Sequence, residues 1–81
     1  MAKSLHTPGY EHFRALLVAA REKAGLTQAE VSAKLRRPQS FVAKYEGGER
    51  RLDVIEFVQV CNALGVDPRA ILSKVQTRLD E

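Results

Sequence analysis

Residues 27–48 read TQAEVSAKLRRPQSFVAKYEGG, and the interpretation of the whole chain starts from them. Thr27, followed three positions later by Glu30, forms the capping-box pattern that starts a helix. The helical pattern stops before Pro38, because a residue that precedes proline is pushed out of the helical region. A second short helix can start at Gln39, and a pair of glycines ends it. The stretch therefore predicts two short helices joined by a tight turn.

Two helices of this length and spacing form the geometry of a helix-turn-helix, in which the second helix lies in the major groove of DNA. The outward positions of that second helix carry amide, hydroxyl, small and basic side chains, namely Gln39, Ser40, Ala43 and Lys44. Side chains that read base edges need donors and acceptors, and Gln and Lys are standard examples. An ordinary helical hairpin with a solvated polar face fits the same spacing, so the spacing alone leaves both interpretations open.

The positive charge of the chain is concentrated around the second short helix. The net charge of the whole sequence is +3. Residues 34–51 contain six basic and two acidic residues, whereas residues 52–81 contain three basic and five acidic ones. A basic face beside a groove-reading helix is what neutralisation of DNA phosphates requires. The alternative is a solvated loop that happens to be rich in arginine.

Length and composition exclude several classes of protein. The 81 residues make one small domain, without an apolar run close to the roughly 20 residues of a membrane span and without a signal-peptide pattern. The lone Cys61 fits a reducing cytosol, and we expect a cytoplasmic protein of a bacterium or phage, associated with the nucleoid. The histidines and the cysteine lack a zinc spacing, and no nucleophile–base pair is evident. We therefore expect no metal, no cofactor and no enzyme activity.

The segments GLTQAEVSAKL and PQSFVAKYEGGERRLDVIEFVQVCNALGVDP resemble the Cro/phage-repressor (XRE) family of helix-turn-helix domains. The family pattern has a Gly-Leu-Thr-Gln-x-Glu opening, a recognition helix with Ser or Gln, a Tyr/Trp-Glu-x-Gly exit and an Ala-Leu-Gly-Val end. The resemblance covers about residues 13–72. It implies an all-α, five-helix fold like that of the lambda repressor. It also implies a sequence-specific transcriptional regulator, a repressor that binds a pseudo-palindromic operator on double-stranded DNA as a homodimer.

We expect a flexible arm over residues 1–9 and a helix-turn-helix domain over residues 10–79. The five helices are predicted at about residues 10–24, 28–35, 39–46, 54–64 and 68–78. Gly25 is expected to end the first helix in a left-handed conformation. Asp53 and Glu56 have the spacing of a second capping box.

The resemblance, carried over residue by residue, assigns DNA contacts to Gln28, Gln39, Ser40 and Lys44, and the chemistry of neighbouring residues adds further candidates. The candidates for base contacts are Gln39, Ser40, Lys44 and Phe41, and we expect the ring of Phe41 to be partly exposed toward DNA. The candidates for phosphate contacts are Gln28, Lys34, Arg36, Arg37, Gly48, Arg50 and Arg51. Arg36 stands where the family usually has glycine, and a non-glycine residue with positive φ costs on the order of 1 kcal/mol. The turn can therefore differ in shape from that of the family, and the sequence leaves its conformation open.

The apolar residues of the fourth predicted helix span more of its circumference than a surface helix needs. They fit a helix buried on most sides, or one with a dimer surface on one flank. The expected dimer interface comprises Val54, Phe57, Val60, Leu72, Val75 and Leu79. The alternative function is a protein-interaction module of the same fold, for example an antitoxin-like partner binder with little DNA specificity.

Overall fold

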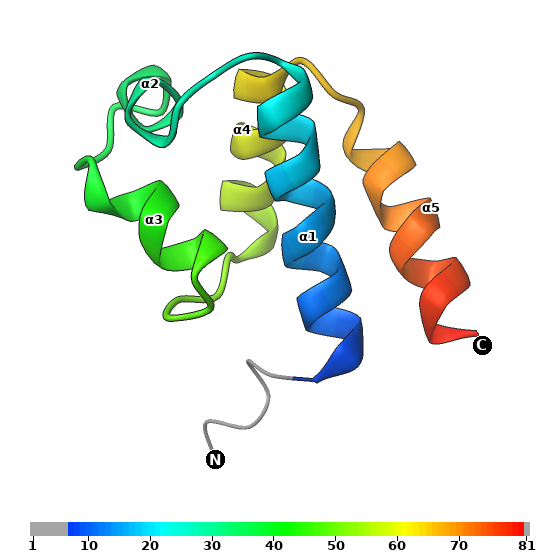
Figure 1. Cartoon of the computed structure of the whole chain (residues 1–81). Helices are drawn as coiled ribbons and strands as arrows, with labels where there is room; N and C mark the ends of the chain where they lie inside the picture. The colour runs from blue at the N-terminus through cyan, green and yellow to red at the C-terminus, as the bar shows by residue number, and fades with distance from the viewer. Residues whose placement is uncertain (1–6, 81) are drawn as a thin grey trace.

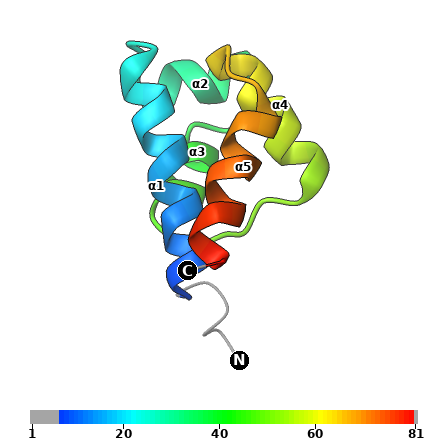
Figure 2. The same cartoon turned by 90° about the vertical axis from the view of Figure 1, so that its right-hand side faces the viewer.

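The structure is a computed structural model that describes residues 7–80, and these form five helices and no strand. The helices are α1 (Pro8–Lys23), α2 (Gln28–Lys34), α3 (Ser40–Glu46), α4 (Val54–Leu64) and α5 (Pro68–Leu79). Figures 1 and 2 show α3 and α5 on opposite sides of the molecule, with α1 and α4 between them. The predicted all-α, five-helix fold is confirmed. No helix in this described part of the chain is long and apolar enough to cross a membrane.

The first helix begins earlier than its predicted start at residue 10. The hydroxyl of Thr7 accepts a hydrogen bond from the backbone N–H of Tyr10 at 3.2 Å, and Pro8 occupies the first helical position. Proline fits there because its fixed φ suits a helix and its missing N–H would have no partner inside the helix. Thr7 to Gly9 therefore belong to the start of α1 and not to a flexible arm. The rest of the predicted arm, residues 1–6, lies outside the described residues.

Side-chain caps fix the starts of three other helices. Thr27 and Glu30 form the predicted capping box of α2, with hydrogen bonds of 3.0 and 2.8 Å. Asp53 and Glu56 form the predicted box of α4, with hydrogen bonds of 2.7 and 3.0 Å. Asp67 caps α5 by accepting from the amide two residues later, at 2.8 Å. Each cap satisfies an amide that has no partner inside its helix.

All five helices contribute to the core. The buried apolar residues are Leu17, Val31, Phe41, Val42, Tyr45, Phe57, Val60, Cys61, Leu64 and Ile71. Four of them come from α4, which makes α4 the central helix. Cys61 is fully buried, and burial raises the pKa of its thiol to about 11. It therefore acts as a small apolar core residue.

Candidate nucleic-acid interface

The turn between α2 and α3 keeps a glycine-like geometry without a glycine. Arg36 has φ of +56°, in the left-handed region. The N–H of Arg36 donates to the carbonyl of Ala33, and the N–H of Arg37 donates to the carbonyl of Ser32, both at 3.0 Å. This is the hydrogen-bond pattern with which a helix commonly ends at a left-handed residue. Arg36 itself therefore adopts the left-handed conformation at this turn, which the sequence left open.

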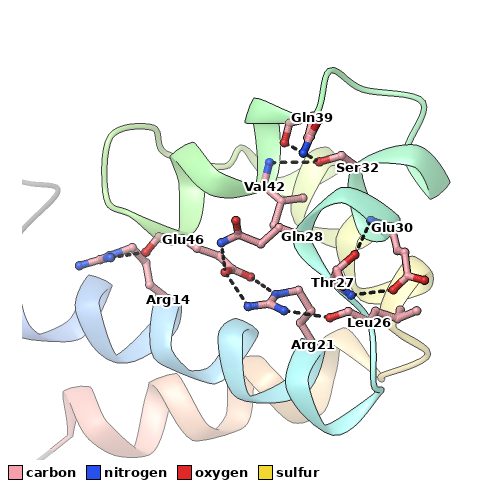
Figure 3. Close-up of polar contacts among 10 residues, drawn as sticks. All are labelled: Arg14, Arg21, Leu26, Thr27, Gln28, Glu30, Ser32, Gln39, Val42 and Glu46. Atoms are coloured by element: carbon pink, nitrogen blue, oxygen red, sulfur yellow. Dashed lines mark hydrogen bonds and ion pairs between the residues drawn. The ribbon is translucent and has the colours of Figure 1, made fainter.

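The cap of α3 comes from α2. Gln39 occupies the N-cap position but makes no capping bond with its side chain. Instead, the buried hydroxyl of Ser32 accepts from the N–H of Val42 at 3.4 Å and donates to the carbonyl of Gln39 at 3.2 Å (Figure 3). Ser32 thus takes the role that an N-cap side chain of α3 would have. The side chain of Gln39 remains exposed.

The helix α3 has one exposed and one buried face. The side chains that were predicted to face DNA from this helix, Gln39, Ser40, Ala43 and Lys44, are all exposed. Val42 and Tyr45 are buried. The predicted exposure of Phe41 is wrong, since only 6% of it is accessible. Its ring packs edge-on against Tyr45 at 5.6 Å and lies under the guanidinium groups of two arginines, so the structure does not present it to a thymine methyl.

Glu46, at the end of α3, fastens this helix to both α1 and α2. Its carboxylate accepts hydrogen bonds from Arg21 at 2.8 and 3.1 Å and from the amide of Gln28 at 2.8 Å (Figure 3). Arg21 also donates to the carbonyl of Leu26 at 2.8 Å. The hydrogen bond to Glu46 raises the pKa of Arg21. Gln28 therefore braces α3, and its phosphate contact stays a prediction.

The loop after α3 is closed by Arg14. Its guanidinium donates to the carbonyl of Glu46 at 2.6 Å and packs over Gly48. Gly48 is buried and has φ of +81°. The amides of Gly47 and Gly48 donate to carbonyl groups of α3, at 2.9 and 3.4 Å. The amide of Gly48 is therefore engaged within the protein in this structure, and its phosphate contact stays a prediction.

Two arginines expected at phosphates bind a carboxylate of the protein instead. Glu56 accepts from Arg50 at 2.9 and 2.7 Å and from Arg37 at 3.0 Å. The hydrogen bond from Arg50 is the largest cause that lowers the pKa of Glu56 to about 2, and burial opposes it. The same two guanidinium groups lie 4.4 and 4.9 Å from the centroid of the Phe41 ring. Sequence spacing revealed Glu56 as a capping residue but not as the partner of these arginines.

Other cations beside α3 are exposed. Lys34, Arg36, Lys44 and Arg51 have exposed side chains on α2, the turn, α3 and the following loop. The guanidinium of Arg51 lies 4.6 Å above the ring of Tyr10. A shallow pocket of about 210 Å³ lies at the start of α3, lined by Arg37, Pro38, Ser40, Phe41, Lys44 and Arg50. The arrangement offers hydrogen-bond donors and positive charge around the exposed face of α3.

The predicted dimer residues divide between the core and the surface. Phe57 and Val60 are buried within the protein, so their assignment to a dimer interface is wrong. The large exposed apolar side chains are Val54, Ile55 and Val58 at the start of α4, and Leu72 and Leu79 on α5. Ile55 and Val58 were missed. A division of the apolar arc of α4 into an inner and an outer flank would have found them, because residues 54, 55 and 58 lie together on the outer one.

The comparisons with known proteins agree with this geometry. The family model of a helix-turn-helix domain matches residues 12–72. A solved structure, described as an XRE-family like protein from Pseudomonas syringae pv. tomato str. DC3000, is 51% identical to this chain. The match covers 94% of this chain and 93% of that chain, with a TM-score of 0.87. A search of the curated proteins finds no match.

Fold and site together define a helix-turn-helix protein of the DNA-binding regulator class. Within that class the chain belongs to the XRE family. Proteins of this kind are typically not enzymes.

Proposed function

We propose that the chain is a sequence-specific transcriptional repressor that binds a pseudo-palindromic operator as a homodimer in the cytoplasm of a bacterium or phage-infected cell. The observation that supports this proposal most strongly is the exposed face of α3. Gln39, Ser40 and Lys44 lie on that face, while Ser32 and Glu46 hold the two ends of the helix (Figure 3). A helix fixed at both ends presents its donors and acceptors to base edges in a constant orientation.

The proposal assigns separate tasks to α3 and its surroundings. Gln39 has the chemistry to bind adenine in a bidentate manner, and Lys44 has the chemistry to bind the O6 and N7 acceptors of guanine. The exposed cations Lys34, Arg36 and Arg51 surround this helix and would bind the phosphate backbone. Contacts of this second kind fix the position of the protein on the duplex without reading its sequence.

A second copy of the chain is the proposed occupant of the exposed apolar surface at the start of α4. Val54 and Ile55 are 74% and 67% exposed there, and Val58 lies one turn further on. This surface directly follows the basic loop, so a two-fold axis beside it would place two α3 helices on the same side of the dimer. Half-sites about 34 Å apart, one turn of DNA, are then expected. Helix α5, which carries the exposed Leu72 and Leu79, lies on the side of the molecule opposite α3 (Figures 1 and 2).

A second candidate function is binding of a protein partner by the same fold. The observation that favours it is an apolar groove of about 460 Å³ where the end of α1 meets the beginning of α5. Leu16, Ala20, Val66 and Ile71 contribute to its lining. An amphipathic helix laid into such a groove is a common mode of recognition.

Selection of bound duplexes from a random pool tests the DNA-binding proposal. The wild-type chain is expected to enrich a palindrome, and binding of that palindrome is expected to weaken steeply with salt. The Gln39→Ala/Lys44→Ala double variant should lose the enrichment, whereas the control Lys74→Ala, on the opposite side of the molecule, should keep it. An unenriched pool, with only weak binding that moderate salt abolishes, would contradict the proposal and favour the protein-partner function.

A further inference from the structure

Two cations beside α3 share one carboxylate. Oε2 of Glu56 accepts from both Arg37 and Arg50, and Oε1 accepts from Arg50 and from the N–H of Asp53. One negative charge therefore faces two positive charges. The guanidinium-bearing side chains are 36% and 37% exposed, whereas that of Glu56 is 9% exposed. The arginines are thus accessible to a ligand on the outside, while the carboxylate lies behind them.

The ring of Phe41 holds the two arginines in place by a second interaction. Each guanidinium carbon lies within 5 Å of the ring centroid, at 4.4 Å for Arg37 and 4.9 Å for Arg50. A cation at such a distance above an aromatic face is attracted by the ring. The position of the arginines therefore does not depend on Glu56 alone. The pocket at the start of α3 is lined by Phe41 and both arginines, together with Ser40 and Lys44, but not by Glu56.

From this geometry we infer that Glu56 is an intramolecular counter-ion that competes with DNA phosphate for Arg37 and Arg50. It is a positioning residue of the proposed DNA site, and the inference rests on the proposed function. A phosphate at the pocket must withdraw a guanidinium from the carboxylate, or share it. Glu56 thereby weakens binding to the backbone of any sequence, so that the base contacts of α3 make up a larger share of the affinity for the operator.

Salt dependence measures this competition, because each phosphate that a cation neutralises adds about 0.9 to the slope of log K against log salt. Glu56→Gln removes the charge and keeps the shape. Glutamine is also accepted at this position of a capping box, so α4 should keep its start. The matched control is Glu49→Gln, which removes one negative charge at an exposed residue of the loop that carries Arg50. Both variants are measured on a random-sequence duplex and on the selected operator.

The expected result is a steeper slope for Glu56→Gln, by about 1 relative to the wild-type chain, with several-fold tighter binding to the random-sequence duplex and a smaller preference for the operator. Glu49→Gln should change the slope much less. Equal slopes for the two glutamine variants would overturn the counter-ion role, because general charge would then explain the effect. A wild-type chain without salt-dependent binding to any duplex would instead overturn the proposed function itself.

A second variant keeps the test decisive if Glu56→Gln does not fold, which circular dichroism would show. Glu56→Asp keeps the charge but shortens the side chain, and so withdraws the carboxylate from the two guanidinium groups. The counter-ion role predicts a slope steeper than that of the wild-type chain for this variant too. An unchanged slope in the folded Glu56→Asp variant would contradict it.

Discussion

The connections before and after α3 both contain a residue with a positive φ, but that residue is an arginine in one and a glycine in the other. Each contains a residue in the left-handed region, Arg36 at φ of +56° before the helix and Gly48 at φ of +81° after it. Arg36 is exposed, so its side chain extends into solvent and adds a cation beside α3. Gly48 is buried, and a Cβ there would lie 3.1 Å from the guanidinium carbon of Arg14. The space around the Cβ position therefore determines at which of the two turns a residue other than glycine can adopt a positive φ.

The comparison also shows how the two connections are linked. Arg37 from the first and Arg50 from the second bind the same carboxylate, that of Glu56. Glu56 in turn belongs to the cap of α4. The segments before and after α3 are thus held to one helix of the core.

Gly48→Ala should lower the free energy of unfolding by about 2–3 kcal/mol, because the positive φ alone costs about 1–2 kcal/mol and the new methyl group displaces Arg14. Gly25→Ala is the matched control. Gly25 has φ of +75° but nothing within 4 Å of the added Cβ, so only the conformational cost applies. Urea denaturation of both variants measures the difference. Equal losses of unfolding free energy in the two variants would show that Arg14 does not restrict the residue at position 48.

The link through Glu56 should make stability depend on pH in the acid range. The pKa of this carboxyl falls from 4.5 to about 2 on folding, so the folded state binds its proton less tightly than the unfolded state. Its contribution, about 2 kcal/mol after allowance for the partly exposed arginines, is present above pH 4.5 and is lost as the pH falls toward 2. The difference in urea stability between wild type and Glu56→Gln should therefore shrink from pH 6 to pH 2. A constant difference would contradict the ion-pair account.

Ser32→Ala should cost about 1 kcal/mol, because it leaves the N–H of Val42 without the hydroxyl that caps α3 from α2. Thermal unfolding would measure this loss. The control is Ser40→Ala, at an exposed serine in the first position of α3, for which little change is expected. If both variants unfold at the wild-type temperature, the first helical turn of α3 does not depend on the cap from Ser32.

Arg36→Gly should stabilise the protein by about 0.5–1 kcal/mol, since relief of the positive φ exceeds the added freedom of glycine in the unfolded chain. Arg36→Ala removes the same cation but keeps the strain, so its stability should stay close to that of the wild type. Chemical denaturation of the pair separates conformation from charge. A stabilised Arg36→Ala variant would mean that repulsion among the cations, and not the positive φ of residue 36, destabilises the wild-type protein.

The local features of the fold could be predicted from the sequence, and the non-local ones could not. The capping boxes of α2 and α4 depend on residues three positions apart, and both predictions are confirmed. The burial of Phe41 depends on arginines from two separate connections, which no short spacing reveals. Similarly, Phe57 and Val60 look equivalent to Val54 on an apolar helix until the positions of α1 and α5 are known.

The most direct test of the central claim compares Gln39→Ala with Arg36→Ala on the selected operator and on a scrambled duplex, across a range of salt. The claim is that α3 reads bases while its flanking cations bind the backbone. Gln39→Ala should reduce the preference for the operator by about 1–3 kcal/mol with an unchanged salt slope. Arg36→Ala should flatten the slope by about 0.9 and keep the preference. A Gln39→Ala variant that weakens binding to both duplexes equally would contradict the claim.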